Sequence, residues 1–471
     1  MRPRGKTKLK LTNKKRFPNG DRKYYFLGLP FLAKKRTAVA VRTYLFGIRI
    51  SKRVLQGAPL PDKGVLSKKQ LARAEYILRA NKGRSIDQNY ENKNKTIRIL
   101  VEVHAIHITY TRGAGIFALG LLKAMEDTGK VRIDFLYDQG NTHLYKKDAF
   151  LKKYKAVMLD QLDDPDSEVY DFYFDPHIGC PYYLKNIAGN VRRESCAKYT
   201  VGILHDMIPF VGRETYVKSW GYDAVKNGML NIFLSDHIFT NSKCTAIDAM
   251  SMLDIPRDKF TVIYGGVDIA RFGNPSNEKL NNDLVALLGG GFNKNVDGAI
   301  VAFIKAYESG KIPKDARLVV ASSLQGSSEE IIAKTKERLP KFAIDDRVVL
   351  FDRHRPSDKE VGDMLRACRA TIYPSFYEGL GLPVLESYAM NKPCIASNNS
   401  SVREITAPEC QFDPFDIDSI TEKIIQIYND QDLAKKSLDF GKKLLDEKCN
   451  WDTAAAKLVA QMENMLKPKE I

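Results

Sequence analysis

Two glutamates with glycines and a proline between them form the most informative pattern in the sequence. The segment Ser375-Phe-Tyr-Glu-Gly-Leu-Gly-Leu-Pro-Val-Leu-Glu-Ser directly follows an apolar run, Ala370–Tyr373. The pattern predicts a buried strand, a glycine-rich loop and then a helix that begins at Pro383, because a first helical residue needs no N–H. Glu378 would then lie in the loop and Glu386 in the first turn of the helix.

This loop has the composition of a phosphate-binding site. Four residues supply its backbone N–H groups: Gly379, Leu380, Gly381 and Leu382. These groups would point outward with the positive end of the helix dipole, which attracts anions. Glu386 could accept hydrogen bonds from ribose hydroxyls, and Glu378 from hydroxyls of the group attached to the phosphate. A helix cap with acids that compensate the dipole is the simpler interpretation, but it does not explain two glycines, a proline and two acids together.

Apolar, β-rich runs alternate with helical patterns from Thr96 onward, which is typical of parallel sheets with crossover helices. In the first half we expect strands at Ile97–Val103, Val131–Tyr137, Val169–Phe174, Tyr199–Leu204, His237–Thr240 and Phe260–Ile263, and helices at Ile116–Met125 and Ser242–Met252. In the second half we expect strands at Leu284–Leu288, Arg317–Ala321, Val348–Phe351, Ala370–Tyr373 and Cys394–Ala396, and helices at Val296–Tyr307, Ser328–Leu339 and Lys359–Cys368. Two such domains bring the carboxyl ends of both sheets to their junction, where ligands bind.

The sequence divides into five segments. Residues 1–95 form a basic extension, 96–267 a first α/β domain and 283–448 a second one. Residues 268–282 between them lose periodicity and gain glycine, proline and asparagine, which indicates a linker. Residues 449–471 contain a last helical pattern, Thr453–Met465, which could pack back onto the body.

The positive charge belongs to the extension. The chain has a net charge of +17, whereas residues 1–95 alone contain 26 Lys and Arg against 5 Asp and Glu, a net charge of +21. A basic extension on a nearly neutral body is suited to a polyanion, either phospholipid headgroups or nucleic acid. A solubilising extension is the simpler alternative.

A repeated pattern occurs within the extension. Tyr25-Phe-Leu-Gly-Leu-Pro-Phe-Leu and Tyr44-Leu-Phe-Gly-Ile-Arg-Ile-Ser lie nineteen residues apart, and basic residues follow each copy. Aromatic and branched residues around a central glycine predict a short bent strand or a hairpin, with aromatics and cations placed for a membrane interface. Nucleic acid is less favoured, because no recognition helix or RNA-binding motif accompanies the charge. Ser67–Asn81 could form an amphipathic helix.

Composition narrows the class of protein. With 471 residues, 44% hydrophobic and 28% charged, the chain is neither fibrous nor largely disordered. Seven cysteines without a C-x-x-C pair indicate a reducing compartment, with no disulfide framework and no structural zinc. The apolar run Thr37–Ile50 is interrupted by Arg42 and Arg49, and Met1–Lys15 lacks the apolar core of a signal peptide. We therefore expect a cytoplasmic protein.

The pair Glu378-x7-Glu386 with Gly-Leu-Gly-Leu-Pro between its members resembles the signature of retaining family 4 glycosyltransferases. Further similar segments are Met364–Ile405, with Lys392-Pro-Cys-Ile-Ala-Ser and Ser400-Ser-Val-Arg-Glu-Ile, and in the first half Gly202-Ile-Leu-His-Asp-Met-Ile-Pro, Phe239-Thr-Asn-Ser and Val262-Ile-Tyr-Gly-Gly-Val-Asp. The resemblance covers roughly Thr96–Met465. It implies the GT-B fold, in which two Rossmann-like domains face each other across a cleft.

The resemblance implies transfer of a sugar from a nucleotide-sugar to an acceptor hydroxyl, with the anomeric configuration kept and with no metal or cofactor. The leaving diphosphate would then be stabilised by helix N-termini and cations. Lys294, in Phe292-Asn-Lys-Asn, matches the phosphate-binding lysine of the family, although it could be an ordinary solvated lysine. The family often has arginine directly before that lysine, and here the position is Asn293. Arg353 and Arg355 are candidates for the missing cation.

The segment Thr111-Arg-Gly-Ala-Gly-Ile, after the first strand, resembles the family's glycine-rich turn, with Gly113 and Gly115 next to the donor phosphate and the acceptor. A rival interpretation is open here, because Gly113-x-Gly115-x-x-Ala118 followed by Asp134 also approximates a dinucleotide fingerprint. The chain would then be an NAD-dependent oxidoreductase. The Glu378–Glu386 segment has no role in such an enzyme.

His205 follows the expected strand Tyr199–Leu204, which would deliver it to the junction, and the family places a functional histidine in this region. It could donate to a hydroxyl of the donor sugar or position the acceptor, and titration near neutrality suits either role. A lone histidine is more often structural. His104, His107 and His177 have weaker claims. No nucleophile for double displacement can be nominated, so front-face departure and attack is the default.

We therefore expect a retaining, metal-independent hexosyltransferase with GDP-mannose as the first candidate donor. Its acceptor would be a glycan or lipid-linked glycan in surface polysaccharide synthesis. The extension would hold it peripherally at an anionic membrane. His205 and Glu378 are the catalytic candidates, and the donor-binding candidates are Gly113, Gly115, Lys294, Gly379, Leu380, Gly381, Leu382 and Glu386. The alternatives are the NAD enzyme and a nucleic-acid-binding protein with a degenerate enzyme body.

Overall fold

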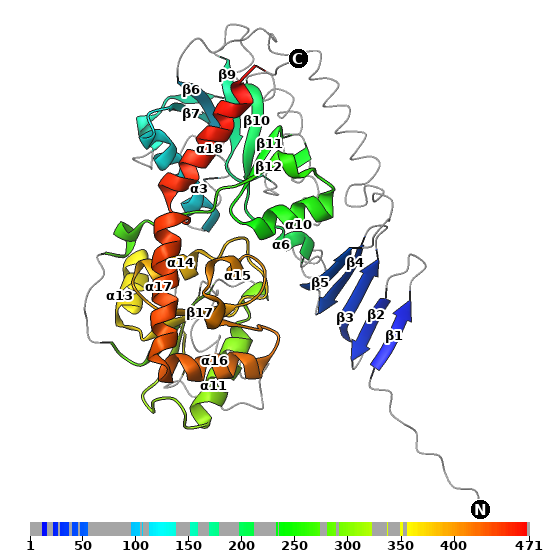
Figure 1. Cartoon of the computed structure of the whole chain (residues 1–471), viewed down its shortest axis with the longest axis vertical. Coiled ribbons are helices and arrows are strands. Elements are labelled where there is room, and N and C mark those ends of the chain that lie inside the picture. Colours follow the sequence, from blue (N-terminus) through cyan, green and yellow to red (C-terminus); the bar gives the residue numbers. More distant parts are fainter. Residues whose placement is uncertain are drawn as a thin grey trace, which may run out of the picture.

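Two α/β domains, a small antiparallel sheet and a returning C-terminal helix make up the computed structural model of the chain (Figure 1). The structure describes the strands between residues 12 and 54 and, in the body, residues 96–103, 106, 113–137, 151–158, 169–178, 197–211, 232–233, 235–273, 280–288, 292–322, 337, 349–351 and 356–468.

Five antiparallel strands pair in chain order near the N-terminus. They are β1 (Thr12–Arg16), β2 (Arg22–Phe26), β3 (Leu29–Arg36), β4 (Ala40–Leu45) and β5 (Ile48–Val54). Both copies of the aromatic and glycine repeat fall on hairpins, β2–β3 and β4–β5, and each hairpin has a register shift next to the tyrosine that begins the copy. The repeat is thus a repeated hairpin, one of the two predicted forms. The expected helix Ser67–Asn81 lies outside the described residues.

The first α/β domain is built on a parallel sheet of seven strands in the order β12-β11-β10-β9-β6-β7-β8. The strands are β6 (Ile97–Glu102), β7 (Val131–Tyr137), β8 (Ala156–Met158), β9 (Tyr170–Asp175), β10 (Ala197–Leu204), β11 (His237–Thr240) and β12 (Phe260–Val262), and the described helices are α3 (Gly113–Asp127), α6 (Ile208–Val211) and α10 (Lys243–Leu253), with short 3-10 helices η1 (Leu151–Lys153) and η4 (Arg257–Lys259). All six expected strands are present. The edge strand β8 was not predicted, because three residues carry too little periodicity.

The second domain repeats this plan with six parallel strands in the order β15-β14-β13-β16-β17-β18. The strands are β13 (Asp283–Leu288), β14 (Arg317–Ser322), β15 (Val349–Phe351), β16 (Ala370–Tyr373), β17 (Cys394–Ser397) and β18 (Gln411–Phe412), and the described helices are α11 (Val296–Glu308), α13 (Asp358–Ala367), α14 (Leu382–Ala389), α15 (Val402–Ile405), α16 (Ile417–Asn429) and α17 (Gln431–Glu447), with 3-10 helices η6 (Phe292–Lys294) and η7 (Pro408–Cys410). The expected helix Ser328–Leu339 falls outside the described residues.

Both sheets reverse their strand order once. The reversal lies between β6 and β9 in the first domain and between β13 and β16 in the second, and the two central strands of each pair are hydrogen-bonded in parallel. Side chains that follow such neighbouring strands come together at the carboxyl edge of a doubly wound sheet, where ligands bind. The candidate residues Lys294 and Glu378 follow β13 and β16, so topology alone brings them together.

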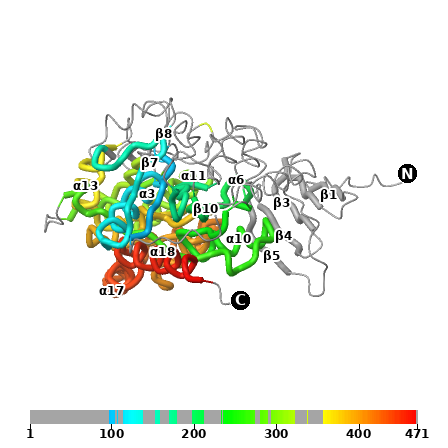
Figure 2. Tube along the Cα trace, turned by 90° about the horizontal axis from the view of Figure 1, so that it is seen from above, coloured from blue at the N-terminus to red at the C-terminus, as the bar shows by residue number. Residues whose placement is uncertain are grey.

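The chain crosses between the domains twice. It first leaves β12 through Tyr264–Val267 and enters the short 3-10 helix η5 (Ile269–Phe272) in the expected linker. After α17 it returns, and α18 (Trp451–Leu466) lies against α3 of the first domain (Figures 1 and 2). The indole of Trp451 fills the space that a Cβ would need at Gly120, 2.5 Å away, and at Gly266. The last helix therefore completes the surface of the first domain.

One large cluster of buried apolar side chains extends through both domains. It includes Phe117 of α3 and Leu380 of the loop before α14, which meet at Gly265 in the first crossover. The five cysteines that the structure describes are free thiols. Within the described residues, no helix is both long and apolar enough to cross a membrane.

Candidate functional site

The loop before α14 ends in a left-handed glycine. Gly381 is the N-cap of α14, with φ of 97°, a conformation that favours glycine. The helix begins at Leu382, one residue earlier than expected, so Pro383 is not its first residue and Glu386 lies beyond its first turn. The prediction that Glu386 lies in the first turn was therefore wrong, because the glycine sets the start of the helix instead of the proline.

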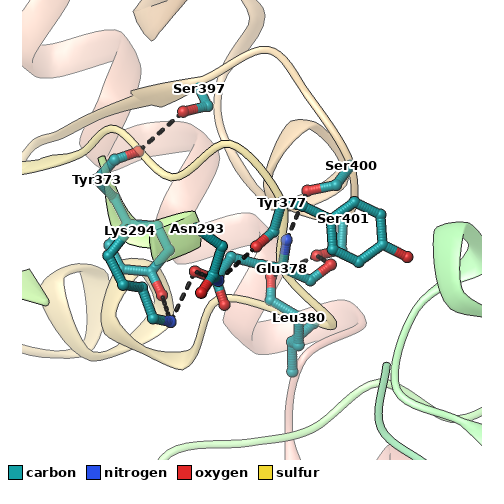
Figure 3. Close-up of polar contacts among 9 residues, drawn as sticks. All are labelled: Asn293, Lys294, Tyr373, Tyr377, Glu378, Leu380, Ser397, Ser400 and Ser401. Atoms are coloured by element: carbon teal, nitrogen blue, oxygen red, sulfur yellow. Dashed lines mark hydrogen bonds and ion pairs between the residues drawn. The ribbon is translucent and has the colours of Figure 1, made fainter. Parts of the chain in front are cut away.

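An ion pair at the strand-order reversal is the centre of the site. The Lys294 Nζ lies 2.7 Å from Glu378 Oε1 and 3.3 Å from the Tyr373 hydroxyl (Figure 3). Lys294 ends η6 after β13, and Glu378 follows β16, so the pair joins residues 84 positions apart. The side chains of Lys294 and Glu378 are only 19% and 8% exposed. The two sequence candidates are thus brought into direct contact.

The Lys294 ammonium is firmly charged. Burial by itself lowers its pKa, but the negative charge of Glu378 and hydrogen bonds to Glu378 and Tyr373 more than offset burial, and the net pKa is raised. A cation held at the start of a helix beside a glycine-rich loop is suited to a phosphate group. Within the part of the chain that the structure describes, the N–H groups of Gly379, Leu380 and Gly381 have no hydrogen-bond acceptor, so they are available to the same anion.

Polar side chains that sequence reasoning did not assign to the site hold this loop in place (Figure 3). Asn293 donates its amide to the Tyr377 carbonyl at 2.8 Å and to Glu378 Oε1 at 3.3 Å. The Ser400 hydroxyl accepts from the Glu378 N–H at 3.0 Å, and the Ser401 hydroxyl donates to the carbonyls of Glu378 and Leu380. The signals were present as Asn293 in place of an arginine and as the Ser400-Ser segment, but neither pattern reveals its partner.

Glu386 has a different neighbour. Its Oε1 lies 4.0 Å from Nη1 of Arg271, a residue of η5 that also pairs with Asp358 at 2.6 Å. Burial raises the pKa of Glu386 to about 7, because it outweighs the lowering effect of Arg271. Near neutral pH this carboxyl is therefore partly protonated and can donate as well as accept a hydrogen bond.

His205 comes from the first domain and is buried at the end of β10. Its Nε2 lies 2.9 Å from the Pro176 carbonyl, so that nitrogen carries the proton, and its ring is edge-on to Phe117 and His177. Burial lowers the pKa of His205 to about 4, although the hydrogen bond to Pro176 opposes the shift. The expectation that His205 titrates near neutrality was wrong, because aromatic rings from elsewhere in the chain exclude water from it.

Asp206, the next residue, is an acid of the first domain whose pKa responds to the charges of this ion pair. Its Oδ1 accepts from the Ile208 N–H at 2.8 Å. Burial raises the pKa of Asp206 to about 6, the Ile208 hydrogen bond lowers it, and the charges of Glu378 and Lys294 act in opposite directions. The sequence showed Asp206 only as the neighbour of His205.

A close contact between the domains requires glycine at position 379. A Cβ on Gly379 would lie 2.0 Å from the His205 carbonyl oxygen, so only glycine fits there. The Thr245 hydroxyl lies 3.3 Å from the carbonyls of both His205 and Gly379. Gly113 and Gly115 lie in the first turn of α3, and a Cβ on Gly113 would contact Leu382 at 3.6 Å. Leu380 is buried in the core, so its side chain is part of the packing between the domains.

The carboxylate that the dinucleotide interpretation requires is engaged in contacts within the first domain. Asp134 lies in the middle of β7, where its carboxylate accepts from the Tyr170 hydroxyl at 2.9 Å and pairs with Arg132 at 3.2 Å. The fingerprint needs this acid near a strand end, free to bind ribose.

Some candidates cannot be placed. His104, His107, Arg353 and Arg355 lie outside the described residues. His177 is partly exposed, and desolvation followed by the charge of His205 lowers its pKa to about 3. Among the residues that are described, no group of three or more His, Cys, Asp and Glu is arranged to hold a metal ion.

Comparison with known proteins identifies the second domain. Residues 275–444 match the model of the family described as Glycosyl transferases group 1. This region is a group 1 glycosyltransferase domain. It contains Lys294, Glu378 and Glu386, so the ion pair and the α14 loop are parts of this domain.

Curated relatives cover part of the chain. The chain is 24% identical over 236 residues to MMP alpha-(1->4)-mannosyltransferase of Mycolicibacterium hassiacum, covering 49% of this chain and 54% of that protein. It is 28% identical over 141 residues to O-antigen chain mannosyltransferase B of Escherichia coli, covering 29% of this chain and 34% of that protein. The chain thus spans about half, or less, of the length of these relatives.

Solved structures share the fold. HepE of Anabaena in complex with UDP and glucose has a TM-score of 0.58 at 14% identity, with 78% of this chain and 100% of that chain covered. Sucrose-phosphate synthase of Thermosynechococcus elongatus has a TM-score of 0.54 at 14% identity, with 79% and 99% covered. The chain has two parallel-sheet domains, the second of which matches the group 1 model, and it shares its fold with these structures. The fold is therefore GT-B, as expected.

Proposed function

We propose that the chain is a retaining glycosyltransferase that moves a hexose from a nucleoside diphosphate sugar to a hydroxyl of a glycan or lipid-linked glycan in surface polysaccharide synthesis. It does so without a metal or cofactor. Mannose carried on GDP is the first donor to test, because the relatives described above are named as mannosyltransferases and one acts on O-antigen chains.

The observation that carries this proposal is the Lys294–Glu378 ion pair next to the N–H groups of Gly379–Gly381, which have no acceptor among the described residues. When a diphosphate binds, Lys294 donates to its oxygens and the N–H groups join it, so negative charge on the leaving group is stabilised. Glu378 then turns to hydroxyls of the sugar. Neutral His205, through the ring nitrogen that does not face Pro176, contacts the sugar or the acceptor.

Thermal unfolding with GDP, UDP, ADP, dTDP and NAD tests the donor class. A ligand at 100 times its dissociation constant stabilises the folded state by about 2.7 kcal/mol. We expect one nucleoside diphosphate to raise the melting temperature, and the matching labelled sugar nucleotide to give a product with the anomeric configuration of the donor. A shift with NAD alone, or no shift with any of the five, would overturn the proposal.

We also propose that the N-terminal sheet attaches the protein peripherally to the cytoplasmic face of an anionic membrane. The strand register brings several basic residues opposite one another. Away from the closed ends of the β2–β3 and β4–β5 hairpins, basic residues pair directly across strands: Lys15↔Lys23, Arg16↔Arg22, Arg22↔Lys34, Lys35↔Arg42 and Arg42↔Lys52. At the closed ends the pairs are Phe26↔Leu29 and Leu45↔Ile48. This register concentrates basic residues within one small sheet, which favours a polyanion as its partner.

Sedimentation with lipid vesicles tests this attachment. Full-length protein is expected to bind vesicles containing phosphatidylglycerol and not neutral phosphatidylcholine vesicles, and a chain lacking residues 1–85 is expected to stay in solution with its turnover on a soluble acceptor retained. Equal vesicle binding by both chains would overturn the proposal. Retention on nucleic acid, with no vesicle binding, would replace the membrane with nucleic acid as the partner.

A further inference from the structure

A carboxylate from the second domain caps a helix of the first. Glu404 belongs to α15, and its two oxygens accept hydrogen bonds from the first two backbone N–H groups of α10: Oε1 from Cys244 at 2.7 Å and Oε2 from Lys243 at 3.0 Å. These N–H groups have no partner within their own helix, and the positive end of the helix dipole favours the negative charge. Glu404 therefore supplies from another domain what a local acid usually supplies.

A third hydrogen bond ties Glu404 to the first crossover between the domains. The Tyr264 hydroxyl donates to Glu404 Oε2 at 2.7 Å. Tyr264 has φ of 49°, a left-handed conformation that is unusual for a residue with a side chain. Lys448, at the second crossover, places its Nζ 3.9 Å from the centre of the Tyr264 ring. Glu404 thus lies where both crossovers, α10 and α15 meet.

The capped helix also contacts the loop that carries Glu378. The hydroxyl of Thr245, the residue after Cys244, lies 3.3 Å from the Gly379 carbonyl. One further turn along α10, Asp248 accepts from the Tyr377 hydroxyl at 2.7 Å. Tyr377 and Gly379 flank Glu378, so α10 contacts the loop before α14 on both sides of this proposed site residue. Glu404 holds the start of the same helix.

We propose that Glu404 is a positioning residue that holds the two domains together, a contact called the clasp below. The clasp places the loop before α14 against the first domain. Its three hydrogen bonds exist only when the domains are in this arrangement, and bonds to a charged group are about twice as strong as neutral ones. Loss of the clasp shifts the domains towards a more open arrangement. The inference goes beyond the proposed function, because it concerns domain geometry and holds for any donor.

Small-angle scattering of the full chain tests the clasp directly. In Glu404→Gln the amide nitrogen of glutamine faces an N–H donor, so one bond is lost and the charge disappears. We expect a larger radius of gyration than in the wild type, with an unchanged circular dichroism spectrum. Tyr264→Phe removes only the third bond and should give a smaller increase. The matched control is Glu409→Gln, an exposed acid in the same domain, which should leave the radius unchanged.

Kinetics then separate positioning from binding. We expect Glu404→Gln to lower kcat about tenfold while the dissociation constant of the nucleoside diphosphate stays within about twofold, because the Lys294–Glu378 pair lies entirely in the second domain. Scattering and kcat equal to the wild type in both Glu404→Gln and Tyr264→Phe would overturn the clasp. If the wild type transfers no sugar, the proposed function fails while the scattering comparison still decides the clasp.

Discussion

The second domain brings a cation and its carboxylate partner to the junction, whereas the first domain brings backbone atoms, a neutral ring and the acid Asp206, whose pKa burial raises to about 6. Lys294 and Glu378 pair with each other inside the second domain. Opposite them lie the His205 carbonyl, 2.0 Å from where a Cβ of Gly379 would be, and the imidazole of His205, with its pKa lowered by burial to about 4. The cation of the ion pair therefore comes from the second domain, and the first domain contributes the closely packed backbone against which the Glu378 loop lies.

This difference predicts two kinds of failure. A positive charge removed from the second domain should slow the reaction, because that charge stabilises the negative charge that develops on the leaving group. An atom added at the contact between the domains should damage assembly instead, because closely packed backbone cannot yield. Four substitutions separate the two.

Lys294→Ala is expected to have the largest effect. We expect kcat/KM for sugar transfer to fall by about 10²–10³-fold, because a cation at the leaving phosphate is lost. The unfolding free energy should also fall, since Glu378 loses its buried partner. Steady-state kinetics and chemical denaturation measure both changes. The matched control is Lys435→Ala, on the exposed face of α17, and transfer near the wild-type rate by Lys294→Ala would refute the charge assignment.

Gly379→Ala should come next. The added Cβ would lie 2.0 Å from the His205 carbonyl, so we expect the unfolding free energy to drop by about 1–3 kcal/mol. Gly113→Ala is the matched comparison, because its Cβ would make an ordinary contact with Leu382 at 3.6 Å. That variant should be as stable as the wild type, and its transfer rate tests the expected role of Gly113 near the donor. Equal stability of the two variants would contradict the close contact.

Glu386→Gln should have a smaller effect that depends on pH. The pKa of this carboxyl is about 7 in the folded chain, raised from an ordinary value of 4.5 chiefly by burial. Between pH 4.5 and 7 the folded state therefore binds more protons than the unfolded state. The free energy of unfolding consequently falls as pH rises through this range. Glutamine does not titrate, so the variant does not lose this stability. The unfolding free energy of the variant minus that of the wild type should therefore be about 1–2 kcal/mol larger at pH 8 than at pH 4. An equal difference in unfolding free energy between variant and wild type at both pH values would contradict the raised pKa of Glu386.

His205 should contribute nothing to the pH profile above about pH 5. Because burial lowers its pKa to about 4, the ring is already neutral throughout the neutral range. We expect His205→Gln to change the rate of transfer but not the shape of its dependence on pH between 6 and 8. The pH–rate profiles of wild type and variant measure this. If the wild-type profile had an inflection near neutral pH that the variant lacked, His205 would titrate in that range and the prediction would fail.

The sequence predicted the strands that surround the site better than the contacts within it. β7, β11 and β16 have the expected bounds, because each is a short run rich in β-branched and aromatic residues. The edge strands β8 and β18 were missed, since two or three residues show no period. Long helices α16 and α17 were not anticipated either, although each begins with an aspartate whose side chain caps it.

Contacts between distant residues escaped prediction for a physical reason. That Lys294 and Glu378 belong to one site followed from their motifs, but that they pair in the absence of a ligand depends on the reversal of strand order between β13 and β16. Asn293 was read as a missing cation, whereas its amide fastens the loop. The buried state of His205 depends on Phe117, which lies far away in the sequence, and no local pattern reports it.

The return of α18 to the first domain has a consequence for synthesis of the protein. The indole of Trp451 occupies the space beside Gly120 and Gly266, so the first domain keeps an apolar seam uncovered until the last part of the chain has left the ribosome. At about 5–20 residues per second, this wait lasts on the order of tens of seconds. The early half of the chain must therefore be protected from aggregation during translation, and a premature stop before Trp451 would damage the half that had already been made.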